Sequence, residues 1–146
     1  GLVGGNGQDI VEKLLELKSE NQDFVFENVP AKPVPSLLRG FSAPVKLKTD
    51  LTDDDLRFLM VHDSDSFNRW ESGYTYALNV LGRLIDATES GKAGAAPGAF
   101  LDSFGLVLAQ ARAPDVDKAL LAFRLALPDI AIIGQSRKLV DTDAIH

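Results

Sequence analysis

The sequence predicts a mainly α-helical chain, in which the helices of a solenoid-like α–α superhelix follow a short β segment. From Asp50 onward, apolar residues recur at helical spacing in several segments that are separated by short turns. Successive antiparallel helices of this kind are typical of a solenoid, because each pair buries its apolar face against the next. Before that point, residues 22–29 are rich in aromatic and β-branched types, and four prolines follow within residues 30–44.

The first 29 residues are expected to contain the β segment. Residues 1–9 are glycine-rich and predict a turn, whereas residues 11–17 fit either a helix or a strand. Helix propensity favours a helix there, but the strand expected at 22–29 needs a partner for its backbone. We therefore expect residues 14–18 to pair with it through a turn at Glu20 and Asn21.

The segment from Pro30 to Pro44 is expected to be extended. Its four prolines restrict the backbone and remove amide donors, which suits the edge of a sheet or the space between two layers. The apolar side chains expected to be buried there are Leu37, Leu38, Phe41 and Val45.

Two helices are predicted after residue 50. Thr52 is the expected N-cap of the first, with Asp55 three residues on in a capping-box position. Asp65 or Ser66 is expected to cap a long second helix. The expected buried positions are Leu56, Leu59 and Met60 in the first helix and Phe67, Trp70, Tyr74, Ala77, Leu78, Leu81, Leu84 and Ile85 in the second.

Further helices are predicted after a glycine- and alanine-rich linker at residues 90–96. Pro97 suits the first turn of one helix, Asp115 is the expected cap of the next, and Pro128 is expected to stop it. The expected inward positions are Phe100, Leu101, Phe104 and Leu108, then Val116, Ala119, Leu120 and Phe123.

The last residues are expected to hold one short helix and the start of another. The short helix covers about residues 129–135, and the next one begins at Asp141 or Thr142 and is not completed. Four apolar side chains are therefore expected to be exposed or covered by another chain: Ile130, Ile132, Ile133 and Leu139.

The composition of the chain argues against a nucleic-acid partner and against a membrane-spanning segment. The net charge of −6 and the pI near 4.8 disfavour nucleic acid, because no basic run would neutralise successive phosphates. The longest apolar run, at residues 125–133, is interrupted and falls short of the roughly 20 residues that span a bilayer. The absence of cysteine suits a reducing intracellular compartment, cytoplasmic or organellar. The first residues carry neither an initiator methionine nor a signal-peptide pattern, which indicates an internal cut or a processed end.

Two stretches carry a resemblance to a known family. The first is Arg39-Gly40-Phe41-Ser42-Ala43-Pro44-Val45-Lys46-Leu47, led in by Pro33-Val34-Pro35-Ser36-Leu37-Leu38. The second runs through Asp50-Leu51-Thr52-Asp53-Asp54-Asp55-Leu56 and His62-Asp63-Ser64-Asp65-Ser66-Phe67-Asn68-Arg69-Trp70-Glu71. Together they resemble the aminopeptidase N family of zinc metallopeptidases, the gluzincins, at the seam between two of its non-catalytic domains. The later helices match that family mainly in their order and in the ending at residues 140–146.

The resemblance implies two partial domains. Residues 1–47 would be the C-terminal part of a small, incomplete β-sandwich, and residues 48–146 the first helices of an α-helical superhelical domain that caps a catalytic domain. The parent would remove single amino-terminal residues from peptides, and this portion would have an architectural role beside the active-site chamber. Its partner would then be the missing catalytic domain.

A second hypothesis stays open beside the first. The chain could be a stand-alone remnant that acts as a structural or protein-interaction subunit of a larger complex. The unfinished last helix and the linker at residues 90–96 suit this hypothesis equally well.

No residue of the chain is expected to be catalytic, to bind a cofactor or to ligate a metal. Zinc chemistry in the resembled family needs a His-Glu-x-x-His string and a further glutamate, but the only histidines here are His62 and His146. The family's Gly-x-Met-Glu-Asn motif is also missing. Zinc is therefore implied for the full-length family, and this chain alone is not expected to be an enzyme.

Several residues have both a functional and a structural interpretation. Asp53, Asp54, Asp55, Asp63 and Asp65 could bind a hard cation, but helix capping explains the same residues. His62 could ligate a metal, but a lone histidine near a helix end more often makes a hydrogen bond or interacts with the helix dipole.

Other candidates lie outside the acidic residues. Arg39 and Arg69 are expected to hold carboxylates across the domain seam, since a guanidinium binds them bidentately. Phe67, Trp70 and Tyr74 could form an aromatic platform with Tyr76, but their helical spacing favours core packing. The run Gly4-Gly5-Asn6-Gly7 lacks the lysine of a phosphate loop and is expected to be a turn.

Overall fold

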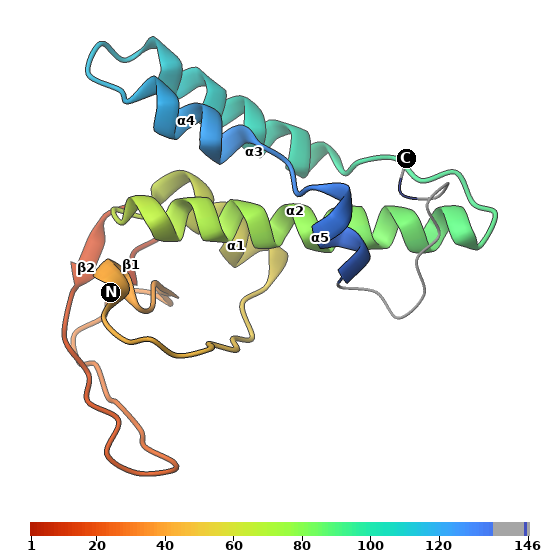
Figure 1. Cartoon of the computed structure of the whole chain (residues 1–146). Coiled ribbons are helices and arrows are strands. Elements are labelled where there is room, and N and C mark those ends of the chain that lie inside the picture. Colours follow the sequence, from red (N-terminus) through yellow and green to blue (C-terminus); the bar gives the residue numbers. More distant parts are fainter. Residues whose placement is uncertain (136–144, 146) are drawn as a thin grey trace.

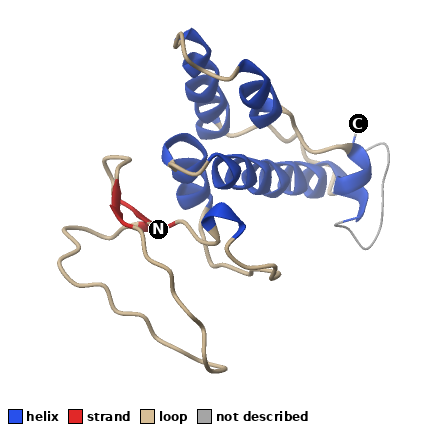
Figure 2. Cartoon of the chain, turned by 60° about the vertical axis from the view of Figure 1, so that its left-hand side comes forward, coloured by secondary structure: helices blue, strands red, loops and turns tan. Residues whose placement is uncertain are grey.

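Helices form most of the structure, and a small sheet lies at one end of them (Figures 1 and 2). This computed structural model describes residues 1–135 and residue 145. The strands are β1 (Leu2–Val3), β2 (Asp9–Val11) and β3 (Val34–Pro35). The helices are α1 (Asp53–His62), α2 (Ser66–Glu89), α3 (Gly98–Ala109), α4 (Lys118–Leu125) and α5 (Ile130–Gln135), with short 3-10 turns η1 (Arg39–Phe41) and η2 (Gln110–Arg112). The predicted fold class, mainly α after a short β segment, is confirmed.

The sheet is antiparallel, with strand order β2-β1-β3. The glycine-rich turn is confirmed between β1 and β2, where Gly4 N donates to Gln8 O at 2.8 Å and Gly7 has a φ of 78°. The flanking strands were not expected, because β1 and β2 are only two and three residues long. β3 carries Pro35 on an edge of the sheet, in agreement with the extended segment that the prolines predict.

The expected pairing of residues 14–18 with residues 22–29 is wrong. No strand or helix is assigned between residues 12 and 33, which form the long loop at the lower left of Figure 1. Leu14 and Val25 are 75% and 83% exposed, so no second layer covers the apolar side chains of this loop. A two-stranded ribbon without such a layer is marginal, and propensity alone does not hold it in register.

The apolar residues of the proline-rich segment are also less buried than expected. Leu37, Phe41 and Val45 are exposed and Leu38 is half-buried, whereas the small polar Ser36 is fully buried. The reason is a tight turn at η1, which directs Arg39 rather than the neighbouring apolar side chains toward the body of the molecule.

The first helix begins and is buried as predicted. Thr52 Oγ1 accepts from Asp55 N at 3.2 Å, and Asp55 Oδ2 accepts from Thr52 N at 2.9 Å, so the capping box is complete. Leu56, Leu59 and Met60 are the buried residues of α1.

The N-cap of α2 is confirmed as Asp65, whose Oδ1 accepts from Asn68 N at 2.9 Å. Its buried face, however, is rotated from the predicted one. Of the predicted positions, Ala77 and Ile85 are buried, and the other buried residues are Asn68, Ser72, Gly73, Tyr76 and Val80. At Gly73 an added Cβ would lie 3.0 Å from Met60 Cγ, so α1 approaches α2 over small and polar residues that a search for apolar positions does not mark.

The pair α3 and α4 is partly as predicted. Phe100 is buried in α3, but Leu101 and Leu108 are exposed and Val107 is the fully buried residue instead. Asp117, not Asp115, caps α4 by accepting from Ala119 N and Leu120 N. The helix therefore starts later than expected, and Leu121 and Arg124 are buried in place of Leu120 and Phe123.

The short helix α5 confirms the helix predicted near residues 129–135. Ile133 is buried, whereas Ile130 and Ile132 are exposed as expected. Leu139, His146 and the helix expected from Asp141 or Thr142 lie outside the described residues.

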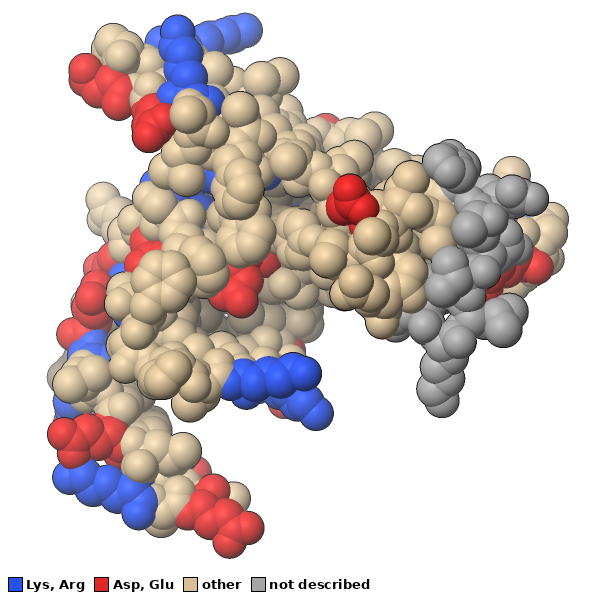
Figure 3. Space-filling view, in the orientation of Figure 1, with Lys and Arg blue, Asp and Glu red and all other residues tan. Residues whose placement is uncertain are grey.

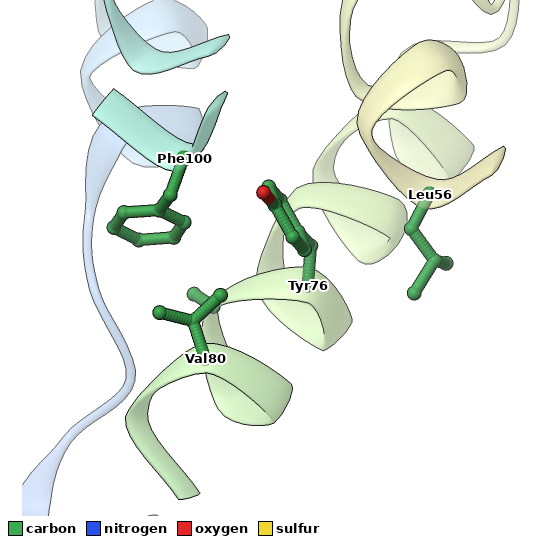
Figure 4. Close-up of a cluster of buried hydrophobic side chains, with 5 residues drawn as sticks. Leu56, Tyr76, Val80 and Phe100 are labelled. Atoms are coloured by element: carbon green, nitrogen blue, oxygen red, sulfur yellow. The ribbon is translucent and has the colours of Figure 1, made fainter. Parts of the chain in front are cut away.

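One core joins the first four helices. Leu56, Tyr76, Ala77, Val80 and Phe100 bring α1, α2 and α3 together, as Figure 4 shows for the four labelled side chains. A second cluster of Met60, Val107 and Leu121 adds α4, and Phe104 packs against both clusters. None of the helices in the described part of the chain combines the length and the apolar character needed to cross a bilayer.

Candidate functional site

Arg39 joins the sheet to the helices and is the centre of the candidate site. Its Nη2 donates to Asp9 Oδ1 at 2.7 Å and its Nη1 to Asp9 Oδ2 at 2.9 Å, a bidentate pair with strand β2. Nη1 also donates to Glu12 at 3.1 Å, and Nη2 donates to Asp63 Oδ1 at 3.0 Å. The side chain of Arg39 is only 8% exposed, so one buried cation holds three carboxylates. This confirms that Arg39 binds carboxylates across the seam.

The backbone around Arg39 is unusual. Leu38, Gly40 and Phe41 all have left-handed φ values, of 55°, 61° and 55°. Leucine and phenylalanine rarely adopt this region, and such strain is kept only where surrounding contacts fix it. Gly40 N donates to Asp65 Oδ2 at 3.1 Å, so the turn η1 is tied to the N-terminus of α2.

Ser36 and Asn68 support the guanidinium from the other side. Arg39 Nε donates to Ser36 Oγ at 2.7 Å, and Asn68 Nδ2 donates to the same oxygen at 2.9 Å. Asn68 Nδ2 also donates to Leu37 O at 2.8 Å. Ser36 and Asn68 are both buried, and neither was identified from the sequence. The only sequence signal for the role of Asn68 was its place in the Asn68-Arg69-Trp70 string that carries the family resemblance.

We call Arg39 and the three carboxylates that it binds, those of Asp9, Glu12 and Asp63, the Arg39 junction. Asp63 belongs to the helical side of this junction. It is the C-cap of α1, its side chain is 0% exposed, and its Oδ1 accepts from Asp65 N at 2.9 Å as well as from Arg39. Within the described chain, Arg39 is the cation that pairs with this buried carboxylate, and Asp63 Oδ2 has no hydrogen-bond partner. Removal of Arg39 would therefore leave a buried negative charge without compensation.

The junction shifts the pKa of its charged groups in opposite directions. Hydrogen bonding from Arg39 lowers the pKa of Asp9 below its ordinary value, against the opposing effect of burial, and Ser64 Oγ donates to Asp9 Oδ2 at 2.6 Å. The hydrogen bond with Asp9 raises the pKa of Arg39 further above its ordinary range. Both groups are thus fixed in their charged forms, which suits a permanent structural tie and not proton transfer.

D9N is expected to lower the free energy of unfolding at neutral pH. It should also make that free energy fall less as the pH is lowered. Because the pKa of Asp9 is lowered in the folded chain, the unfolded chain binds the proton first, and stability falls as the pH drops below about 4. Thermal unfolding at pH 7 and at steps down to about pH 3 measures this. D23N, at an exposed aspartate of the loop, is the control and should match the wild-type profile. A D9N profile parallel to wild type at every pH would contradict the role of Asp9.

The acidic residues of the helix termini are capping and pairing groups. Asp55 and Asp65 cap α1 and α2, Asp53 binds Arg83 and Asn79, and Asp54 pairs with Arg57. In the described residues, no group of three or more histidine or acidic side chains is placed so as to hold a metal ion. Capping is therefore confirmed for Asp55 and Asp65, whereas Asp53 and Asp54 form side-chain contacts with other helix residues.

His62 lies at the end of α1 against the β1–β2 turn. Its ring is 4.8 Å from that of Phe58, and a Cβ added at Gly7 would lie 2.6 Å from His62 Nδ1. The left-handed glycine therefore allows the turn to approach the histidine. Gly4 to Gly7 serve this turn, as predicted.

Arg69 differs from the expectation. It was predicted to hold a carboxylate, but its hydrogen-bond partner is Ser66 Oγ at 3.4 Å, and no ion pair forms between it and any residue in the described ranges. Its Nε is buried without a partner.

The aromatic residues of α2 form a partly exposed row. Phe41 and Phe67 have ring centroids 4.5 Å apart, Phe67 and Trp70 5.4 Å, and Trp70 and Phe123 5.2 Å. Core packing is wrong for Phe67, which is 37% exposed, and Trp70 and Tyr74, whose ring centroids are 5.2 Å apart, are only half-buried. Phe41 and Phe123 are exposed as well. We call Phe41, Phe67, Trp70 and Phe123 the aromatic row; Tyr76 belongs to the core instead.

Arg124 is a buried charge that the sequence did not reveal. It is 6% exposed, and it donates to Met60 O at 2.8 Å and to Gln110 Oε1 at 3.0 Å. No carboxylate pairs with it among residues 1–135 and 145. Burial and the charge of Arg69 lower its pKa to about 10. Its place three residues after Leu121, on the buried stripe of α4, was the only available signal.

Beside the junction lies a cavity of about 280 Å³. Leu47, Leu51, Leu56 and Leu59 contribute apolar walls, and Glu71 is the charged residue among those that line it. The cavity is small for a ligand pocket. Its lining residues come from β3 and the chain that follows it, and from α1 and α2. On the face drawn in Figure 3, acidic and basic side chains are intermingled, and no continuous basic field appears there.

Two family models match consecutive parts of the chain. A family model described as a domain of unknown function with ARM repeats (DUF3458_C) matches residues 53–146. A model described as a domain of unknown function with an Ig-like fold (DUF3458) matches residues 1–50. The ARM-repeat description confirms the predicted α–α superhelix.

Relatives with known names cover nearly the whole chain. It is 33% identical over 92% of its length to aminopeptidase N of Escherichia coli and 34% identical over its full length to aminopeptidase N of Caulobacter vibrioides. Among solved structures, it matches Legionella pneumophila aminopeptidase A in complex with aspartic acid, with a TM-score of 0.76 and 31% identity over 99% of the chain. The chain spans only 15–16% of the length of each of these proteins.

Proposed function

Because the chain belongs to the aminopeptidase N family, in which it matches the DUF3458 portion, we propose that it is an architectural part of a zinc aminopeptidase. In this proposal it supports the active-site chamber and contributes no catalytic residue. The parent enzyme removes amino-terminal residues from peptides, and the partner of this segment is the catalytic domain of the same polypeptide.

The observation that carries the proposal is the Arg39 junction. It ties the strand β2 to the corner between α1 and α2 through carboxylates of Asp9 and Asp63, with a buried guanidinium and strained backbone around it. Such a fixed contact sets the angle between a sheet and a helical array, which is what an architectural seam requires. We propose the domain boundary at residues 47–48, and the family models that end at residue 50 and begin at residue 53 support it.

Zinc enters this proposal only through the parent enzyme. A zinc site of this family needs two histidines on one helical face, and the residues of this chain do not fit it, because His62 and His146 are separated by most of the sequence. We therefore place every zinc ligand and every catalytic group of the parent outside residues 1–146. An intracellular location belongs to the same proposal and is supported by the absence of cysteine.

The test is to isolate the native protein with an antibody against this segment and to measure its intact mass, zinc content and hydrolysis of an alanyl chromogenic substrate. We expect a mass far above 15.8 kDa, about one zinc per chain and activity. A small, zinc-free and inactive species that travels with other proteins would overturn the proposal and favour a stand-alone interaction subunit.

A further inference from the structure

Two arginines on neighbouring helices lack a carboxylate partner in the described chain. Arg69 on α2 makes a single long hydrogen bond, to Ser66 Oγ at 3.4 Å, and Arg124 on α4 binds only neutral oxygens. The Nε atoms of both side chains are buried and unpaired. In a chain of 21 acidic and 15 basic residues, two partly or fully buried cations without an acidic partner are unexpected.

The two helices that carry these arginines meet at this place. Trp70, next to Arg69, stacks on Phe123, next to Arg124, with centroids 5.2 Å apart and an interplanar angle of 24°. The two positive charges also act on each other, since Arg69 contributes to the lowered pKa of Arg124. An anion at this position would relieve the repulsion and satisfy donors that are otherwise partly buried without a partner.

The surface beside the arginines has the composition of a protein interface. Phe41, Phe67 and Phe123 of the aromatic row are exposed, and Trp70 is half-buried between them. Aromatic residues and arginine are enriched at the centres of interfaces, where burial of the ring is combined with a charged hydrogen bond. Arg69 is half-buried and therefore reachable, whereas Arg124 acts through its charge from beneath.

We propose that Arg69 and the aromatic row bind an acidic side chain, Asp or Glu, from the part of the aminopeptidase polypeptide that lies outside residues 1–146. This inference rests on the proposed function. Two facts support this occupant: a carboxylate binds a guanidinium strongly and bidentately, and the relatives are about six times longer than the chain, so most of each protein lies outside the matched segment. A second copy of this acidic segment and a peptide ligand are alternative occupants that the test distinguishes.

The experiment uses the full-length protein with the R69K substitution, which keeps the charge and supplies an amine. A water-soluble carbodiimide then joins that amine to a carboxylate in direct contact, and mass spectrometry identifies the cross-linked peptide. We expect an intramolecular cross-link from position 69 to an Asp or Glu outside residues 1–146. R112K is the matched control at an exposed arginine of the turn η2, and we expect no such specific cross-link there.

Several outcomes would overturn the inference. These are a cross-link to an acid within residues 1–146, a cross-link between two copies of the protein, one that forms only with an added peptide, or none. If R69K fails to fold, p-benzoylphenylalanine at position 67 samples the same surface with both arginines intact, and its adduct should fall near an acidic residue outside the segment. A small native protein without zinc would refute the proposed function, whereas a large zinc enzyme with none of the expected cross-links would refute this inference alone.

Discussion

Replacement of Arg39 by methionine is expected to destabilise the 146-residue chain by about 3–5 kcal/mol, because it leaves a buried carboxylate without its cation. The cost comes mainly from Asp63, whose side chain is 0% exposed and whose Oδ2 has no hydrogen-bond partner among the described residues. Asp9 is partly exposed and Glu12 is mostly exposed, so water compensates both of these carboxylates in part. Urea unfolding measures the loss.

Two further variants separate charge from geometry at this position. R39K keeps the cation but not the fork that binds Asp9 through both oxygens, so its stability should lie between wild type and R39M. The double variant R39M/D63N removes the buried negative charge as well and should recover part of the loss. Equal stability of R39M and wild type would show that Arg39 does not hold the sheet to the helices.

Replacement of Phe100 by alanine is expected to cost about 3–5 kcal/mol through the cavity it leaves. Phe100 is buried where α1, α2 and α3 meet, with its ring 5.4 Å from that of Tyr76 and 4.7 Å from that of Phe104. In a closely packed core, the neighbouring side chains relax only partly into such a space.

The phenol of Tyr76 reports the same change independently. Burial, with a smaller contribution from Asp53, raises its pKa above the ordinary value, so F100A should let water in and shift that pKa back down. Urea unfolding and an ultraviolet titration of tyrosine are the two measurements. L101A, at the exposed neighbour, is the control and should change neither. A loss below about 1 kcal/mol for F100A would mean that the three helices do not share this core.

The ends of the helices could be predicted because their signals are local. Thr52 with Asp55, and Asp65 with Asn68, need only three residues of chain to make their hydrogen bonds. Asp117 shows the limit of this reasoning, since Asp115 offers the same carboxylate two residues earlier and local sequence does not choose between them.

The strands and the buried face of α2 could not be predicted in the same way. Leu14 and Val25 have the right residue types for strands but no second layer to cover them, and that layer is a property of the tertiary structure. On α2, helices approach from two directions, so Ser72 and Gly73 become interior positions although neither is apolar. An apolar stripe marks one contact surface and does not show a second one formed by small residues.

The candidate site was predicted in part. Arg39 was identified because it lies in a recognisable string, and its carboxylate partners followed from the chemistry of guanidinium. Arg69 was chosen by the same argument and lacks an ion-pair partner in the described chain, whereas Arg124 gave no motif at all. The distance from a cation to an acid far along the sequence depends on the fold, and residue type alone does not contain it.

The three left-handed residues at η1 also bear on how the molecule moves. Leu38, Gly40 and Phe41 follow one another around Arg39, and the guanidinium is fixed to both the sheet and the corner between α1 and α2. A rotation of the sheet against that corner would have to break several charged contacts together. We therefore expect the sheet and the corner between α1 and α2 to move as one rigid body. Bending in this segment is then left to the loops at residues 13–33 and 90–97, for which the described structure shows no ion pair to the sheet or to a helix.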